Sequence, residues 1–208
     1  MSIKIAIVDD QDIIRLGVQQ SLSGVPTITF LGGYDTLESF CEVTACQKAH
    51  VVLLDDSLPG IDELEAIRIV QAHCPDVAVV LLGSRLTAHS IHEAIAAGAS
   101  GIICKKEPVQ AIMVAGIQYA HAGKVYLSPN AALIAGYIGH LPMLTKRLHD
   151  ILKLMARGYV VQDIARELGI SRQAVYRRRT RLKEILEVDT NEQIVAEAIR
   201  RGLLSDEL

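Results

Sequence analysis

Short, nearly continuous runs of apolar residues recur along the first half of the chain, and polar residues follow each of them. The clearest runs cover residues 3–8, 51–54 and 101–104 and are rich in Val, Ile and Leu. Runs of this length without polar alternation are typical of strands that are buried on both faces of a parallel sheet. Two further runs, at 28–31 and 77–82, bring the predicted strands to five.

Segments in which apolar residues recur at helical spacing lie between these runs. The predicted helices cover 12–22, 35–47, 62–73, 87–97 and a segment that starts at Pro108. Alternating strands and helices predict an α/β domain with a doubly wound, five-stranded parallel sheet, which we place at residues 1–123. Residues 124–142 contain two prolines and two glycines, so we expect a linker with a short helix there.

Beyond the linker, the apolar residues keep helical spacing and show no strand pattern. The predicted helices cover 145–157, 161–168, 171–186 and 190–201. Gly169 separates the middle two helices, and Ser171 stands where a helix N-cap is expected. A helix, a tight turn and a second helix in this order are typical of a helix-turn-helix. We therefore expect residues 143–208 to form an all-α, four-helix domain of helix-turn-helix type.

The net charge of -3 conceals an uneven distribution along the chain. Residues 1–142 carry 8 Lys and Arg against 14 Asp and Glu, whereas residues 143–208 carry 13 against 10. A basic C-terminal part favours a polyanionic partner such as duplex DNA. The cysteines follow no metal-binding spacing, no signal peptide is recognisable, and no apolar stretch reaches the roughly 18 residues of a membrane span. We expect a cytoplasmic protein with reduced thiols and no membrane contact.

Charged residues stand at the carboxyl ends of three predicted strands. Asp9 and Asp10 follow the first strand, Asp55 follows the third and Lys105 follows the fifth. Ligands of open parallel sheets bind at this edge, so we expect the four side chains to lie together. Magnesium prefers carboxylate oxygens, and a carboxylate can attack phosphorus while an ammonium group neutralises a phosphoryl oxygen. Acidic residues at strand ends are often only solvated loop residues, but their joint spacing favours a magnesium and phosphoryl site.

Residues 3–121 resemble the receiver domain of two-component response regulators. The resemblance rests on three stretches, Val8 to Arg15, Leu53 to Gly60 and Ala97 to Gly101, the last of which leads to Lys105. It implies a domain that catalyses its own phosphorylation with Mg²⁺ and takes the phosphoryl group from a sensor histidine kinase.

The same resemblance assigns roles to individual residues. It implies Asp55 as the phosphoacceptor and Lys105 as the partner of the phosphoryl group. The implied ligands of Mg²⁺ are Asp9, Asp10, Asp55 and the backbone carbonyl of Ser57.

Three positions depart from the receiver pattern. Gly83 ends the fourth strand where Thr or Ser is usual, Ile102 replaces an aromatic residue, and Asp56 replaces an apolar one. Ser84 could supply the missing hydroxyl only through a local distortion, because adjacent strand residues face opposite sides. Either Asp55 is phosphorylated and the signal takes another route, or this is an atypical regulator controlled without phosphorylation by dimerisation, a ligand or a partner. We favour the first, since every residue needed for the chemistry is present.

The second helix of the helix-turn-helix pattern is strongly basic. Between residues 171 and 186 it carries six Arg and Lys against one acid, Glu184. Basic helices are often only solvated, but this placement favours entry into a DNA major groove. We expect Ser171 to cap the helix so that its amide groups face a phosphate. The residues expected at base edges are Gln173, Tyr176, Arg177 and Thr180, and those expected at phosphates are Arg172, Arg178, Arg181 and Lys183.

Residues 144–204 resemble the DNA-binding domain of NarL/LuxR-type (FixJ-type) regulators. Ala156 to Gly158 and Arg200 to Leu203 carry this resemblance together with the helix-turn-helix. It implies a homodimer on inverted half-sites, but Tyr176 replaces a common lysine, so the base preference of the family does not carry over. We expect a transcription regulator and not an enzyme. The competing functions are a phosphatase or phosphotransferase that uses the same aspartate, and an output domain that binds RNA or protein.

Overall fold

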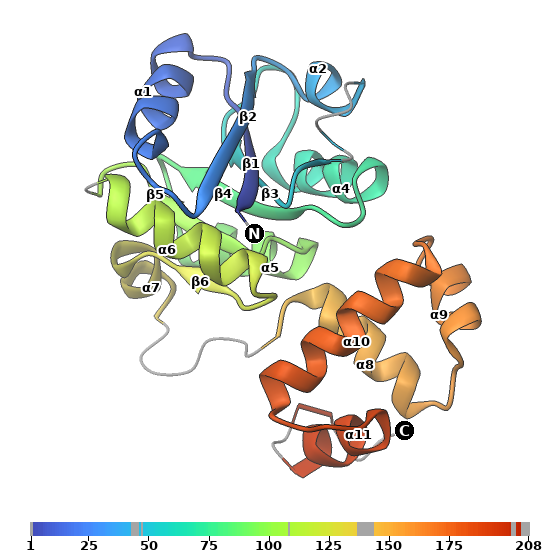
Figure 1. The fold of residues 1–208 in the computed structure, drawn as a ribbon. Coiled ribbons are helices and arrows are strands. Elements are labelled where there is room, and N and C mark those ends of the chain that lie inside the picture. The colour runs from blue at the N-terminus through green and yellow to red at the C-terminus, as the bar shows by residue number, and fades with distance from the viewer. Residues whose placement is uncertain are drawn as a thin grey trace. The chain divides into compact units, whose positions relative to one another are not determined.

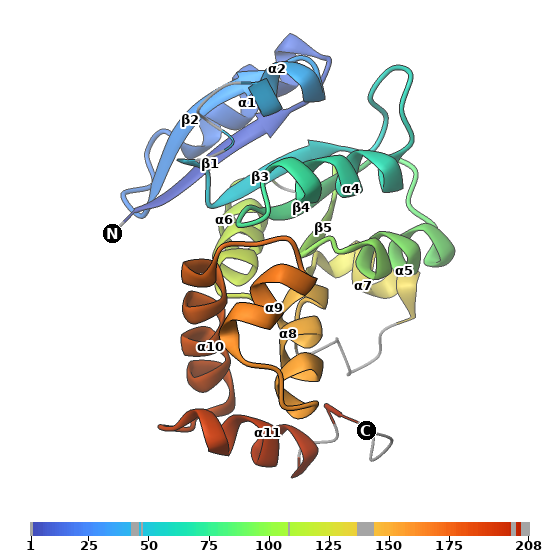
Figure 2. The same ribbon diagram turned by 90° about the vertical axis from the view of Figure 1, so that its right-hand side faces the viewer.

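The computed structural model of the chain describes residues 2–42, 46, 48–107, 109–136, 144–200 and 203–204. Its backbone divides into two compact units, Met1–Pro142 and Met143–Leu208. Figures 1 and 2 show that the first unit contains a sheet with helices and the second contains helices alone.

The first unit is built on a six-stranded sheet with the strand order β2-β1-β3-β4-β5-β6. The strands are β1 (Ile3–Val8), β2 (Ile28–Tyr34), β3 (Val51–Asp55), β4 (Ala78–Gly83), β5 (Gly101–Cys104) and β6 (Tyr126–Leu127). Every neighbouring pair is parallel. The predicted doubly wound parallel sheet is therefore confirmed, with one strand more than expected.

Helices cover both faces of this sheet. One face packs against α1 (Asp12–Leu22) and α6 (Val109–His121), and the other against α2 (Leu37–Glu42), α4 (Glu63–His73), α5 (Ala88–Ala97) and α7 (Pro129–Ala135) (Figures 1 and 2). Successive strand residues face opposite sides, so Ile5 and Ile7 join the first core and Ala6 and Val8 join the second. The strand sequences are continuously apolar because alternate residues are buried in the cores on the two faces of the sheet. Pro108, the expected start of α6, lies outside the described residues.

The sixth strand corrects the predicted count of five. β6 lies in the segment expected to be a linker, and it pairs Tyr126 with Gly101 and Leu127 with Ile102. A strand of two residues has no periodicity of its own, so only its pairing with β5 identifies it. α7 is the short helix expected in this segment, and it packs on α5 and β5. The expected boundary between residues 142 and 143 lies outside the described residues.

The described residues of the second unit form four helices, as predicted. They are α8 (Lys146–Ala156), α9 (Val161–Glu167), α10 (Arg172–Leu186) and α11 (Asn191–Arg200). All four contribute buried apolar residues to a single core. Gly169 makes the turn between α9 and α10 with a φ of 62°, in the left-handed region that glycine favours. Ser171 caps α10 by accepting a hydrogen bond from the backbone N of Ala174 at 3.1 Å.

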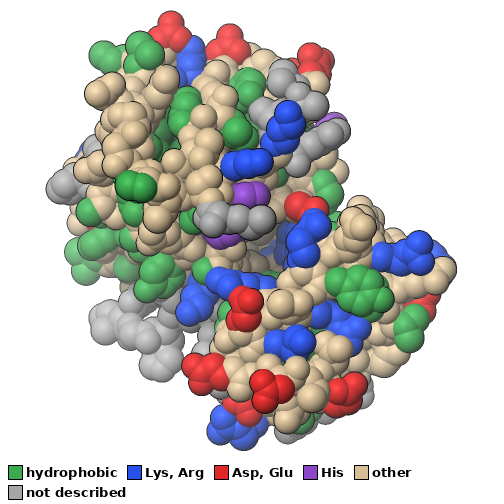
Figure 3. Space-filling model, viewed as in Figure 1, with side chains coloured by type: hydrophobic (Ala, Val, Ile, Leu, Met, Phe, Trp, Pro, Cys, Tyr) green, Lys and Arg blue, Asp and Glu red, His purple; other side chains and the backbone are tan. Residues whose placement is uncertain are grey.

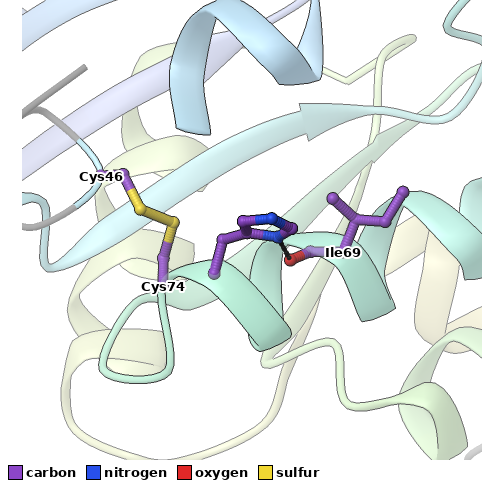
Figure 4. Close-up of a disulfide and its surroundings, with 4 residues drawn as sticks. Cys46, Ile69 and Cys74 are labelled. Carbon is purple, nitrogen blue, oxygen red and sulfur yellow. Dashed lines mark hydrogen bonds between the residues drawn. A yellow bond between two sulfur atoms is a disulfide. The ribbon is translucent and has the colours of Figure 1, made fainter. Parts of the chain in front are cut away.

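The expectation of reduced thiols is wrong for one pair of cysteines. Cys46 and Cys74 form a disulfide whose Cα atoms lie 5.6 Å apart (Figure 4). Cys46 precedes β3 and Cys74 follows the last residue of α4, so the bond closes a loop that contains both elements. Cys41 and Cys104 are free. The two bonded residues are separated by 28 positions that form no recognisable motif, and only the fold brings them together.

We expect a reductant to lower the melting temperature of the first unit in the natural sequence but not in a Cys74→Ser variant. A disulfide that closes a loop of this length destabilises the unfolded chain by about 3–4 kcal/mol, which corresponds to roughly 10 °C for a unit of this size. Calorimetry with and without dithiothreitol measures the shift, and Cys41→Ser is the matched control that should retain it. Peptide mapping that finds only free thiols under oxidising conditions would contradict the disulfide.

Candidate functional site

The sheet brings the three acidic residues of the predicted site together at its carboxyl edge. β1 and β3 are parallel neighbours with Val8 opposite Leu54, so Asp9 and Asp10 leave the sheet beside Asp55. One carboxylate oxygen from each of the three lies within 4.8 Å of the other two. Asp9 and Asp55 are 0% and 1% exposed, whereas Asp10 is exposed. Two of the three negative charges are therefore removed from water.

Lys105 follows β5 and meets the same carboxylates. Its Nζ donates to Asp9 Oδ2 at 3.0 Å and to Asp55 Oδ1 at 2.7 Å. Burial lowers the pKa of Lys105, but its hydrogen bonds to Asp55 and Asp9 outweigh this effect, so the pKa is raised. Burial also raises the pKa of Asp9, although hydrogen bonds from the Gln11 backbone and from Lys105 oppose it. The lysine is held in its charged form between two buried carboxylates.

Lys105 pairs with two of the three clustered carboxylates, Asp9 and Asp55, and Asp10 leaves a surplus of negative charge in the site. Carboxylates this close together repel one another unless a cation or a proton lies between them. All the clustered ligand atoms are oxygens, which suits a hard cation that takes one or two carboxylates and several waters. Ser57 lies in the loop after β3, and its hydroxyl donates to Asp55 Oδ2 at 3.4 Å. The residues thus fit Mg²⁺ both in donor type and in charge.

The end of β4 is filled at the position where a hydroxyl-bearing side chain is usual. A Cβ added to Gly83 would lie 2.2 Å from Leu86 Cδ2, so Leu86 already occupies that space. On β5, Ile102 is buried in the core between the sheet and α4 and α5. The backbone O of Gly83 accepts a hydrogen bond from the backbone N of Lys105 at 2.8 Å. The end of β4 therefore meets the lysine through its backbone.

Asp56 makes a contact that the sequence did not reveal. Its Oδ2 accepts from the backbone N of Ser84 at 2.8 Å, which joins the loop after β3 to the loop after β4. Its Oδ1 is buried without a hydrogen-bond partner among the described residues. Burial, followed by the charge of Asp56, raises the pKa of nearby Glu63. The acid next to Asp55 thus fastens the two loops that border the site.

Gly83→Thr should destabilise the first unit, because the added side chain overlaps Leu86. Overpacking of this kind costs about 1–3 kcal/mol. Leu86→Ala should relieve the overlap. The variant with both substitutions should therefore lose less free energy of unfolding than the two single variants lose together. Urea denaturation of the four proteins of this double-mutant cycle measures the coupling. Additive effects would contradict the packing of Leu86 against position 83.

The expected base-edge residues share one exposed face of α10. The exposed residues of the expected DNA contacts are Ser171, Arg172, Gln173, Tyr176, Arg177 and Thr180. The half-buried ones are Arg178, Arg181 and Lys183. Arg181 pairs with Glu184, and Lys183 donates to the backbone O of Asp189 at 3.4 Å. Several Lys and Arg side chains gather over the second unit in the space-filling view (Figure 3). The exposed face is accessible to base edges in a DNA groove, and the half-buried basic residues beside it are placed for contacts with backbone phosphates.

Comparison with protein families identifies both units. The response regulator receiver domain matches residues 5–115, and the helix-turn-helix domain of resolvase matches residues 139–178. The chain therefore belongs to the response regulators, with a receiver domain followed by a helix-turn-helix domain of the NarL/LuxR type. It is a DNA-binding regulator of transcription in a two-component system.

Individual relatives align over nearly the whole chain. Response regulator GacA of Pseudomonas aeruginosa is 29% identical over 97% of this chain and 98% of its own length. GacA of Pseudomonas syringae is 30% identical over the same shares, and UvrY of Escherichia coli is 26% identical over 99% and 97%.

Solved structures show the same fold. The response regulator ChrA of a heme-sensing two-component system has a TM-score of 0.53 at 24% identity, covering 98% of this chain and 99% of its own. A structure of RcsB dimers bound to DNA has a TM-score of 0.60 at 18% identity, covering 96% and 98%. In the part of this chain that the structure describes, no helix is long and apolar enough to cross a membrane.

Proposed function

We propose that this regulator is switched by phosphorylation of Asp55 in a magnesium-dependent receiver. The observation that carries the proposal is the pair of hydrogen bonds from Lys105 to Asp9 and Asp55, at 3.0 and 2.7 Å. An ammonium group fixed beside a nucleophilic oxygen stabilises the charge that an incoming phosphoryl group brings. The proposed ligands of Mg²⁺ are Asp9, Asp10, Asp55 and the backbone carbonyl of Ser57.

In the proposed reaction, the protein contributes mainly by positioning the reacting groups and stabilising charge. A carboxylate oxygen of Asp55 attacks the phosphorus of a phosphohistidine on a sensor histidine kinase, or of acetyl phosphate, and forms a P–O bond. The bond from phosphorus to the donor breaks, and its electron pair leaves with the imidazole nitrogen or the acetate oxygen. A magnesium ion held by Asp9, Asp10 and Asp55 would neutralise charge on the phosphoryl oxygens. Lys105 exchanges part of its contact with the carboxylates for a contact with the phosphoryl group.

For the output domain we propose a homodimer that reads inverted half-sites of duplex DNA. The second helix of a helix-turn-helix enters the major groove with its N-terminal residues at the base edges. Gln173, Tyr176, Arg177 and Thr180 are exposed in that part of α10, which supports this assignment. The proposed phosphate contacts are Arg172, Arg178, Arg181 and Lys183, with Ser171 capping the helix. Dimers on DNA, as the RcsB structure contains, are the arrangement we propose for this chain.

Asp55→Ala should abolish labelling of the protein by acetyl phosphate, because it removes the attacking oxygen. The neighbouring carboxylate provides the matched control, and Asp56→Asn should still be labelled at Asp55. Mass spectrometry of the intact protein and its peptides measures the modification. Labelling that persisted in Asp55→Ala would refute the assignment.

Magnesium should also raise the melting temperature, and beryllofluoride should raise it further. A shift with magnesium alone would favour control by dimerisation, a ligand or a partner instead.

Arg172→Ala should weaken binding to every DNA sequence, whereas Gln173→Ala should relax sequence preference. Loss of one phosphate contact lowers the slope of log K against log salt by about 0.9, and loss of a bidentate base contact costs about 1–3 kcal/mol at one base pair. Footprinting on duplex DNA at several salt concentrations measures both effects. Arg200→Ala is the control, since it removes the same charge from α11, where Arg200 pairs with Glu197. Equal effects of all three substitutions, or tighter binding of RNA, would speak against α10 as the DNA-reading helix.

A further inference from the structure

The turn that carries Lys105 is bound to the start of α7. The backbone N of Glu107 donates to the O of Cys104 at 3.1 Å, so Lys105 and Glu107 belong to one closed turn. Glu107 is only 8% exposed, and its Oε1 accepts from the backbone N of Asn130 at 2.8 Å. This carboxylate therefore caps the first turn of α7 from a residue outside the helix.

Ser128 provides a second connection between the same elements and is 0% exposed. Its hydroxyl accepts from the backbone N of Cys104 at 3.1 Å, and its own N donates to the O of Ile102 at 3.0 Å. Its carbonyl accepts from the N of Ala132 within α7 at 2.8 Å. A buried residue that is hydrogen-bonded through its hydroxyl oxygen, its backbone N and its carbonyl holds its neighbours in one arrangement. These hydrogen bonds thus join the end of β5 to the start of α7.

Within the described part of the chain, only one of the two carboxylate oxygens of Glu107 accepts a hydrogen bond. Its Oε2 is buried and has no hydrogen-bond partner among the described residues. A buried carboxylate with one satisfied oxygen is costly, so a small displacement of the turn changes its free energy considerably. The nearby charge of Glu107 also contributes, after burial, to raising the pKa of Tyr126 on β6. This side chain is the least satisfied component of the contact between the Lys105 turn and α7.

Signal transmission from Asp55 needs a route in this chain other than a hydroxyl at the end of β4. Leu86 fills the space at Gly83, and Ile102 lies in the core. The Lys105 turn, by contrast, contacts the site at one end and α7 at the other. α7 is the last described element before the chain continues to α8. The turn is therefore the physical connection between the acidic site and the segment that leads to the DNA-binding domain.

We propose that Glu107 and Ser128 form a coupling latch that transmits the state of Asp55 to α7. When Lys105 exchanges part of its contact with Asp9 and Asp55 for a phosphoryl group, the turn shifts, the bond from Asn130 to Glu107 weakens, and the first turn of α7 loosens. Glu107 is a positioning residue, since it acts through the Lys105 turn and does not touch the reacting atoms. The inference rests on the proposed phosphorylation of Asp55 and adds the route by which it is reported.

Hydrogen exchange of the full chain with magnesium, with and without beryllofluoride, tests the latch. In the natural sequence, the mimic should speed exchange in the peptide that covers α7. Glu107→Ala should speed it at least about fivefold without the mimic, because a charge-assisted hydrogen bond is lost, and should leave little further response. Glu107→Gln keeps an oxygen that can accept from Asn130 and should restore most of the response. The matched control is Lys106→Ala, an exposed position in the same turn, which should behave like the natural sequence.

The outcomes separate the latch from the function on which it rests. If acetyl phosphate does not label Asp55, the proposed function fails. If Asp55 is labelled but the exchange of α7 ignores the mimic, the latch is overturned. It is equally overturned if Glu107→Ala speeds exchange yet keeps the full response, because Glu107 then has only a structural role. Should Glu107→Ala fail to fold, Ser128→Ala gives the same readout, with retained labelling and a reduced response of α7 expected.

Discussion

Two buried carboxylates meet at one edge of the sheet, and the ammonium group of Lys105 is the cation that makes their burial tolerable. Removing a charge from water costs several kcal/mol unless a partner compensates it, and breaking such a pair typically costs about 3–5 kcal/mol. Lys105 compensates both Asp9 and Asp55, and the exposed Asp10 adds charge that it does not contact directly. The site is therefore stable in a form that still attracts a cation. Its architecture depends on β1, β3 and β5 being parallel.

The packing around this charge cluster decides how a change in it can spread. At the end of β4, Leu86 fills the space beside Gly83, and Ile102 is fixed among apolar neighbours, so neither position offers a polar side chain that could respond to the site. Close-packed apolar cores resist small displacements. The polar contacts lie instead along the backbone and in the turn from Lys105 to Glu107. The coupling that we propose uses these hydrogen bonds.

Local sequence signals predicted most of the fold and the clustering of the site. The runs that form β1, β3 and β5 are continuous because they are buried on both faces, and Ser171 marks the start of α10 by its capping chemistry. The convergence of Asp9, Asp55 and Lys105 followed from one rule, that the carboxyl ends of parallel strands share an edge.

The features that sequence analysis missed all depend on long-range pairing. β6 is identified by its pairing with the edge of β5, and Cys46 lies beside Cys74 because of how β3 and α4 pack in the fold. Glu107 is an ordinary acidic residue in sequence, and its role arises only where the start of α7 reaches it. Partners separated by 20 or so residues leave no periodic trace, so no window of sequence could have paired them.

Contacts within the helix-turn-helix domain itself hold α10 in place. Val175 and Leu182 anchor α10 in the core, while Gln173 and Arg177 stand on the opposite, exposed face. The cap at Ser171 is made within the helix itself. The exposed face of α10 is therefore formed by contacts within this domain alone. β6 and α7, which precede this domain along the chain, belong instead to the receiver sheet and its helical layer.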